Sequence, residues 1–170
     1  MQMMRQSMRS LAPQFSTARM VREYTDRFYM PSNQTFHALQ ENGCARAKAA
    51  LEWRKRVREA WPSVAIRSVQ DTVHAQQITG DEFSITANVE LGSLSSGEVR
   101  VQAITGMVGP NRELLDTEVF DMTDKGNGVF EVTLPCRQPG HHGYVCRVVP
   151  FHEDVRVATE LPVVCWQNVG

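Results

Sequence analysis

The sequence lacks the segments that take a chain into or across a membrane. Among its 170 residues no apolar run approaches the roughly 20 that a helix needs to span a bilayer, and the N-terminus has no apolar signal-peptide core. Lysine and arginine number 18 and acidic residues 19, so the formal net charge of -1 gives no reason to expect a nucleic acid as the main partner. We therefore expect a cytoplasmic chain with no membrane and no nucleic acid partner.

The sequence also has no recognisable pattern for disulfides or for a metal ion. Its four cysteines are Cys44, Cys136, Cys146 and Cys165. Their spacings match no compact disulfide framework, so we expect four thiols. Soft metal ligands do gather between Cys136 and Cys146, where His141 and His142 lie, but they form no closed CxxC zinc knuckle. If Cys146 lies in a strand core and the histidines lie on a connection, the side chains point apart, and we predict no metal site.

Motifs of catalysis are missing as well. The sequence contains no Gly-x-Ser-x-Gly, no His-Glu-x-x-His and no P-loop. Two pairs of nearby carboxylates, Glu153 with Asp154 and Asp121 with Asp124, lie where loops or strand ends are expected. We interpret these carboxylates as solubilising groups and predict no catalytic residue in the chain.

Helical periodicity dominates residues 1–61, where we expect about three helices. The first has apolar residues at helical spacing from the first position onward, namely Met1, Met4, Met8 and Leu11. No capping residue or turn precedes them, so this helix is already under way at residue 1. That pattern indicates a fragment of a longer protein, although a disordered start would look the same.

The second expected helix spans residues 16–30. Ser16 has the chemistry to cap its first turn. Apolar side chains recur four residues apart on one side, at Met20, Tyr24 and Phe28. Pro31 disfavours helical geometry at the residue before it, so we expect the helix to end there.

The third expected helix runs from Ser32 to about residue 61. The dipeptide Asn42-Gly43 in its middle indicates either a break between two shorter helices or close packing against another helix. The helix carries a basic run formed by Arg46, Lys48, Arg54, Lys55, Arg56 and Arg58. Glu52 and Glu59 interrupt this run, so we interpret it as a solvated face rather than a nucleic-acid site.

Beyond Pro62 the period of the apolar residues changes from about 3.6 to 2, which predicts a boundary between a helical segment (1–61) and an all-β domain (62–170). We expect seven strands, at residues 64–69, 81–91, 98–104, 117–122, 129–134, 143–149 and 163–166. Seven short strands separated by turns favour a two-sheet sandwich of immunoglobulin type over a barrel. The predicted fold class is therefore α+β.

Tyr144 lies two residues before Cys146, at the start of the sixth expected strand. This placement is typical of a tyrosine corner, in which the hydroxyl bonds to upstream backbone, and it fits equally well a tyrosine that simply packs. No earlier strand offers a partner cysteine, so the disulfide of antibody domains is not implied.

The most recognisable stretch lies between residues 7 and 31. It follows the pattern S-x-x-x-L-A-P-x-F-S-x-x-R-M-V-R-E-Y from Ser7 to Tyr24, and continues with Phe28, Tyr29 and Pro31. This stretch resembles the end of the catalytic region of the bacterial α-glucan phosphorylases, the glycogen and maltodextrin phosphorylase family. The likeness continues less sharply through W-R-K-R-V-R-E-A-W-P, residues 53–62, and into the β-rich tail.

The resemblance implies a C-terminal fragment of an enzyme whose active site lies upstream. In that family a lysine Schiff base holds pyridoxal phosphate, and α-1,4-glucans are cleaved with phosphate to glucose 1-phosphate. The only lysines here, Lys48, Lys55 and Lys125, match none of the family's cofactor motif, so no catalytic or cofactor-binding residue is carried over. The implied partner is the remainder of the parent phosphorylase, and we expect the helical segment to self-associate or to be mobile without it.

A second hypothesis is a stand-alone immunoglobulin-like module that binds carbohydrate or protein. Exposed aromatic residues such as Tyr29, Phe151 or Trp166 would then stack on sugar rings. Stacking needs aromatic residues on one flat exposed face, and the expected strands offer few, so we favour the phosphorylase fragment.

Overall fold

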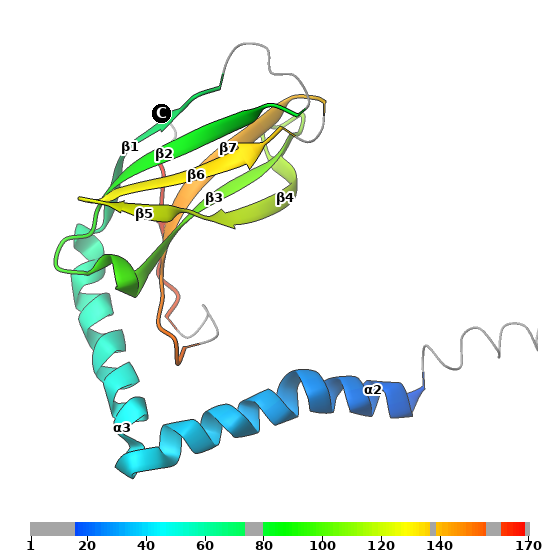
Figure 1. Cartoon of the computed structure of the whole chain (residues 1–170), viewed down its shortest axis with the longest axis vertical. Coiled ribbons are helices and arrows are strands. Elements are labelled where there is room, and N and C mark those ends of the chain that lie inside the picture. The colour runs from blue at the N-terminus through cyan, green and yellow to red at the C-terminus, as the bar shows by residue number, and fades with distance from the viewer. Residues whose placement is uncertain (1–15, 74–79, 137–138, 156–160, 169–170) are drawn as a thin grey trace, which may run out of the picture. The chain divides into compact units, whose positions relative to one another are not determined.

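The chain divides into two compact units, Met1–Ala49 and Ala50–Gly170. The structure is a computed structural model that describes residues 16–73, 80–136, 139–155 and 161–168 (Figure 1). The helix expected at the very start of the chain lies outside these described residues. Within the described ranges no helix is both long enough and apolar enough to cross a membrane.

Helix α2 (Thr17–Tyr24) begins where the sequence predicts. The Ser16 side chain accepts a hydrogen bond from the backbone N–H of Arg19, 3.2 Å away, and so caps the first turn. The helix does not end before Pro31, because a π-helical turn (Thr25–Tyr29) leads directly into helix α3 (Met30–Ala60). The prediction that Pro31 ends this helix is therefore wrong.

The π-helical turn explains how the helix continues past Pro31. Proline has no N–H to donate, and its ring clashes with the carbonyl four residues earlier in an α-helix. Just before the proline, the backbone N–H of Met30 donates to the carbonyl of Thr25, five residues back, and the turn is wider there. A local change of helix type thus accommodates a residue that usually ends a helix.

Helix α3 is interrupted at residues 41–44. Glu41 has an extended backbone with ψ of 150°, and Asn42, Gly43 and Cys44 have φ of 52°, 65° and 63°. A Cβ added at Gly43 would meet no atom within 4 Å, so close packing is not the reason for the glycine. Of the two alternatives for Asn42-Gly43, the break is the one observed. In place of about three helices, the described residues form one long helical segment with a π-helical turn and this break.

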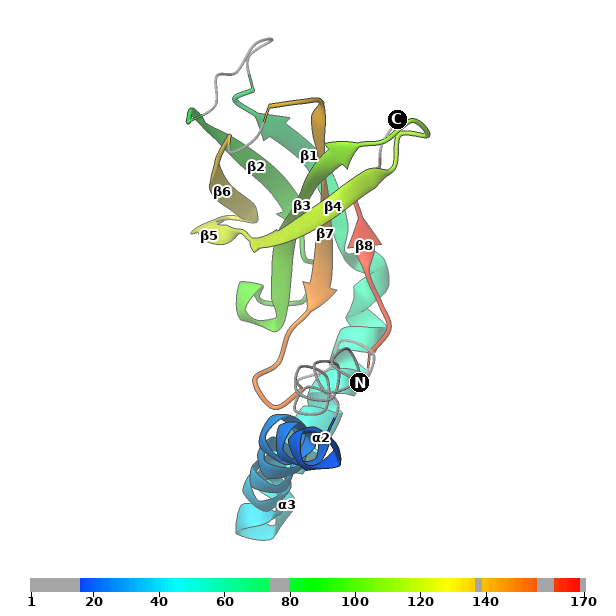
Figure 2. The same cartoon turned by 90° about the vertical axis from the view of Figure 1, so that its right-hand side faces the viewer.

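The second unit contains two four-stranded antiparallel sheets (Figures 1 and 2). The strands are β1 (Ala65–Asp71), β2 (Glu82–Glu90), β3 (Val99–Val108), β4 (Leu114–Asp121), β5 (Thr123–Gly126), β6 (Val129–Pro135), β7 (His142–Pro150) and β8 (Cys165–Trp166). Sheet A has the order β1-β2-β6-β5, and sheet B has the order β4-β3-β7-β8. All seven expected strands are present, and β5 forms where a turn was expected. The α+β class is confirmed.

One hydrophobic core contains residues of both sheets. The alternating residues Ile85, Ala87 and Val89 of β2 are buried in it, as are Val101 and Ala103 of β3. The end of helix α3 joins the same core, because Trp53, Val57 and Trp61 are only 4%, 0% and 9% exposed. The predicted boundary between residues 1–61 and 62–170 stays a prediction, and these buried side chains argue against two units with separate cores.

Tyr144 of β7 contacts β1 of the other sheet. Its hydroxyl donates to the Asp71 carboxylate oxygen Oδ2, 2.5 Å away, and not to upstream backbone. Partial burial and the neighbouring carboxylate raise the pKa of Tyr144 above its usual value, so the phenol stays protonated as a donor. The tyrosine-corner interpretation is therefore wrong, and the residue links the two sheets through a side chain.

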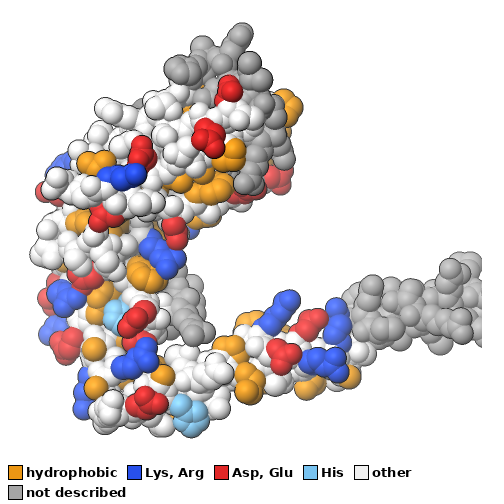
Figure 3. All heavy atoms as spheres, in the orientation of Figure 1, with side chains coloured by type: hydrophobic (Ala, Val, Ile, Leu, Met, Phe, Trp, Pro, Cys, Tyr) orange, Lys and Arg blue, Asp and Glu red, His pale blue; other side chains and the backbone are white. Residues whose placement is uncertain are grey.

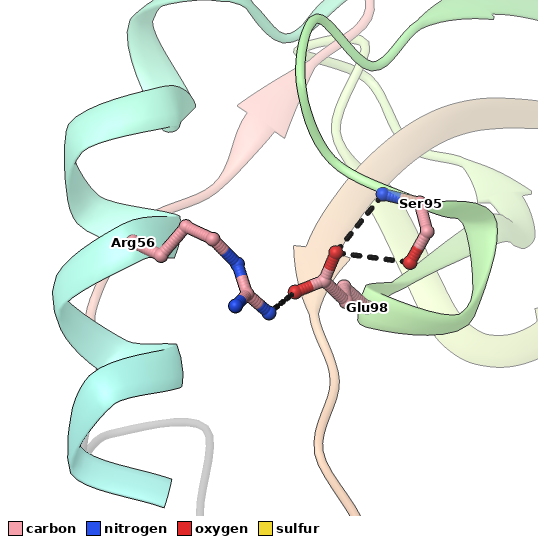
Figure 4. Close-up of polar contacts among 3 residues, drawn as sticks. All are labelled: Arg56, Ser95 and Glu98. Atoms are coloured by element: carbon pink, nitrogen blue, oxygen red, sulfur yellow. Dashed lines mark hydrogen bonds and ion pairs between the residues drawn. The ribbon is translucent and has the colours of Figure 1, made fainter. Parts of the chain in front are cut away.

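A polar contact joins the last turns of α3 to the 3-10 turn Ser96–Glu98 (Figure 4). The Glu98 carboxylate accepts hydrogen bonds from the Ser95 backbone N–H at 3.0 Å and the Ser95 hydroxyl at 2.9 Å, and from the Arg56 guanidinium. Partial burial alone would raise the pKa of Glu98, but the bonds from Ser95 and Arg56 hold it below its usual value. Glu98 therefore supports both its own turn and the helix.

We predict that the β unit needs the end of α3. Trp53→Ala removes a buried indole and should lower the free energy of unfolding by about 3–5 kcal/mol, because it leaves a cavity between helix and sheets. Leu51→Ala, at an exposed position two residues away, is the control and should change it by less than about 0.5 kcal/mol. Urea unfolding of a chain starting at Ala50 and of one starting at Pro62 extends the test. Equal stability of these two chains would show that the helix is dispensable.

A second prediction concerns pH. The folded-state pKa of Glu98 is lowered, so its contribution to stability is present above the unfolded-state pKa and is lost as pH falls through the folded one. Glu98→Gln should therefore cost about 1 kcal/mol at neutral pH and nothing at an acidic pH below the lowered folded-state pKa, where the carboxyl is protonated. Denaturant unfolding at both pH values measures this, with the exposed Glu52→Gln as control. A loss of equal size at both pH values would contradict the prediction.

Candidate binding surfaces

No lysine of the chain suits a Schiff base with pyridoxal phosphate. Such a lysine is activated by desolvation or by neighbouring charges in an enclosed site. Lys48 and Lys55 are exposed on α3, and Lys125 is exposed on β5, where its Nζ lies 3.0 Å from Glu131 Oε2. The residues present therefore do not fit this cofactor.

The cysteines and histidines between residues 136 and 146 do not converge. Cys146 is fully buried on β7, and burial raises the pKa of its thiol to about 11, which disfavours the thiolate that a metal needs. Cys136 follows β6 of the other sheet, while His141 and His142 are exposed. Within the described ranges no three His, Cys, Asp or Glu side chains lie close enough to hold a metal ion. All four cysteines are free thiols.

The described part of the first unit presents an apolar surface. None of residues 16–49 is buried. Its large exposed hydrophobic residues are Met20, Val21, Tyr24, Phe28, Tyr29, Met30 and Phe36. The centroid of the Tyr24 ring lies 5.5 Å from the centroid of the Phe28 ring and 6.4 Å from that of the Tyr29 ring. Figure 3 shows hydrophobic side chains at the surface along this segment. The helical segment therefore exposes the kind of face that a helix normally buries.

A row of polar and aromatic side chains crosses the outer face of sheet B. We call it the outer row, and it consists of Phe151, Arg100, Asp121, Gln102, Arg147 and Trp166. Its centre is Asp121, which accepts hydrogen bonds from Arg100 Nη1 at 2.9 Å and from Gln102 Nε2 at 2.7 Å. Asp121 was interpreted from the sequence as a solubilising group, but it orders its neighbours on β3.

Both ends of the outer row are aromatic rings that lie next to guanidinium groups. Arg147 Nε donates to Gln102 Oε1 at 2.9 Å, and its Cζ lies over the Trp166 ring, 5.5 Å from the centroid. At the other end Arg100 Cζ lies 3.9 Å from the centroid of the Phe151 ring. The result is an unbroken sequence of contacts across all four strands of sheet B and the residue that follows β7.

Aliphatic residues lie beside the outer row on the same face. Ile104 follows Gln102 at a two-residue step on β3, and it pairs with Val119 of β4 and Val145 of β7. Ile104 is 8% exposed, whereas Val119 is 49% exposed. Outward-facing positions on a solvated sheet are normally polar, so this face differs from a purely solvated one.

The outer face of sheet A provides the contrast. Most outward positions of its central strands are polar, at Ser84, Thr86, Asn88, Glu131 and Thr133, and Val129 is an apolar one among them. Ser84 and Thr133 hydroxyls bond to each other across the strands at 2.9 Å. Sheet A therefore has the composition of a solvated face, and sheet B has that of a contact face.

The fold and these surfaces define an α+β chain in which a helical segment with exposed apolar side chains precedes a two-sheet β unit. Residues 61–168 match the family described as the glycogen phosphorylase C-terminal domain, and the chain belongs to this family. The resemblance seen in the sequence is thereby confirmed.

Individual relatives agree with the family. The chain is 31% identical over 169 residues, 96% of its length, to glycogen phosphorylases of Mycobacterium tuberculosis and Mycobacterium bovis. It is 25% identical over 179 aligned residues, 98% of its length, to the maltodextrin phosphorylase of Thermococcus litoralis. It covers 20% of each, so the chain spans about a fifth of the length of the curated relatives it matches.

Proposed function

We propose that the chain is the C-terminal part of an α-glucan phosphorylase and supports catalysis structurally without performing it. On this proposal the parent enzyme cleaves α-1,4-glucans with phosphate to give glucose 1-phosphate, using pyridoxal phosphate bound outside this chain. The observation that carries the proposal is the match itself, which spans nearly the whole chain but only 20% of each relative. The exposed positions of all three lysines support the same assignment.

We also propose that the two sheets form an immunoglobulin-like sandwich that serves as an accessory module. The strand orders support this. With β1, β2, β5 and β6 as strands A, B, D and E, sheet A has the order A-B-E-D of constant-type domains. With β3, β7 and β8 as C, F and G, sheet B has the order C-F-G plus one further edge strand.

The helical segment, on this proposal, completes the end of the parent's catalytic region. Its apolar side chains, with Tyr24 and Phe28 among the most prominent, then pack against polypeptide that precedes this chain in the parent. Covering about 400 Å² of apolar surface would contribute about 10 kcal/mol at about 25 cal/mol per Å². This is of the same order as the whole stability of a domain, so isolation of the segment has a measurable consequence.

We predict that the chain alone neither forms a Schiff base with pyridoxal phosphate nor releases glucose 1-phosphate from glycogen or maltodextrin. The physical reason is that Lys48, Lys55 and Lys125 are all exposed. Absorbance of the purified chain after incubation with the cofactor, together with a phosphorolysis assay, measures both properties. A stable stoichiometric adduct at one of these lysines would contradict the proposal.

We predict concentration-dependent self-association of the chain through its helical segment. Met20→Lys combined with Phe28→Glu should abolish it, because the two changes place charges on the exposed apolar side. The matched control, Gln40→Lys with Gln34→Glu, adds the same charges at exposed polar positions and should leave association unchanged. Light scattering over a dilution series measures both variants. A strictly monomeric chain with a rigid helical segment would mean that this segment is self-sufficient.

A further inference from the structure

We propose that the outer face of sheet B is the surface through which this domain docks onto the rest of its own phosphorylase polypeptide. The inference rests on the proposed function, since it requires a parent enzyme. It adds which of the two sheets makes the contact and which side chains make it.

The composition of the face is that of a protein interface. Aromatic residues and arginine are enriched in such interfaces, whereas lysine, glutamate and aspartate are depleted. Asp121 is an exception on this face, and its charge is paired with Arg100. The outer row supplies Trp166, Phe151 and two arginines, and the aliphatic residues beside it supply an apolar centre around Ile104. The outer face of sheet A offers serine, threonine and asparagine at the equivalent places, so the two faces are not interchangeable.

The outer row is also ordered before any partner arrives. Arginine and glutamine side chains lose rotamer freedom on binding, and this loss lowers affinity. Here Arg100, Gln102 and Arg147 are already held by hydrogen bonds of 2.7–2.9 Å to one another and to Asp121. On a solvated face such bonds add little stability, whereas a docking face binds more tightly because its side chains are already ordered.

The face specifies the chemistry of its partner. Val119 is 49% exposed beside the buried Ile104, so it favours an apolar side chain opposite it. A guanidinium has five N–H donors, and the bonds described use one donor of Arg100 and one of Arg147. The partner must therefore present backbone carbonyls or carboxylates around an apolar centre, which a protein surface does.

Two further observations favour protein over carbohydrate. A sugar ring stacks on an open aromatic face, but Arg100 already lies over the Phe151 ring, 3.9 Å from its centroid, so the 46% exposed Trp166 is the one open ring of the outer row. The relatives also contain much additional polypeptide, because the chain covers only 20% of each. The covering protein is accordingly the remainder of the parent.

Cysteine labelling tests the proposal. Val119→Cys places a thiol on the outer face of sheet B, and Asn88→Cys, also exposed, places the control thiol on the outer face of sheet A. Each variant is made in this chain and in the full-length parent, and maleimide labelling rates are read by peptide mass spectrometry, which separates them from the native cysteines. We expect both thiols to react at similar rates in the isolated chain. In the parent, Val119→Cys should react at least tenfold more slowly and Asn88→Cys at an unchanged rate.

The possible outcomes separate the alternatives. Equal labelling of Val119→Cys in both proteins overturns the docking proposal and leaves the phosphorylase assignment intact. Protection in the isolated chain that rises with its concentration assigns the face to a second copy, and protection only on addition of glycogen assigns it to carbohydrate; either result overturns the proposal. A gene with no phosphorylase region upstream overturns both the proposed function and this inference.

Discussion

The core of the second unit includes three apolar residues from the end of helix α3, and this burial attaches the helix to the sheets. Trp53, Val57 and Trp61 lie in the same core as β2, β3 and β6, although they precede the first strand. The contact fixes the start of β1 relative to the sheets, because the 3-10 turn Trp61–Ser63 follows the helix without a linker. Apolar burial makes this attachment of the helix strong. The hydrogen bond from Arg56 to Glu98 then helps to orient the helix against the 3-10 turn.

Much of the fold was readable from the sequence, because short-range patterns determine it. The Ser16 cap and the seven strands follow from residue type and spacing, and they are observed. The number of helices could not be predicted from the sequence. Pro31 is accommodated by a hydrogen bond from the Met30 N–H to the Thr25 carbonyl, and no residue pattern predicts this bond. Helix propensity rules describe the average cost of proline, whereas the structure shows a local geometry that avoids the clash.

The outer row shows why a surface site is harder to predict than a strand. Alternation along β3 places Arg100 and Gln102 on one face, and that much follows from the sequence. Their partners Asp121, Arg147 and Trp166 come from three other strands, and only the pairing register brings them together. Register depends on contacts between strands far apart in sequence, which one sequence does not reveal. The sequence identified Phe151 and Trp166 as aromatic residues that could contact a partner. It did not show that both lie on the same face of one sheet.

The two units differ in what holds them together. The β unit has a buried core, so its order is explained by its own residues. The helical segment has no buried residue among those described, and isolated helices gain too little from backbone hydrogen bonds alone to be more than marginally stable in water. Its capped start, its π-helical turn and its aligned aromatic residues are nevertheless those of a specific helix and not of a linker. Because the described residues of this segment have no core of their own, the segment needs a surface outside them, and under the proposed function the remainder of the phosphorylase supplies it.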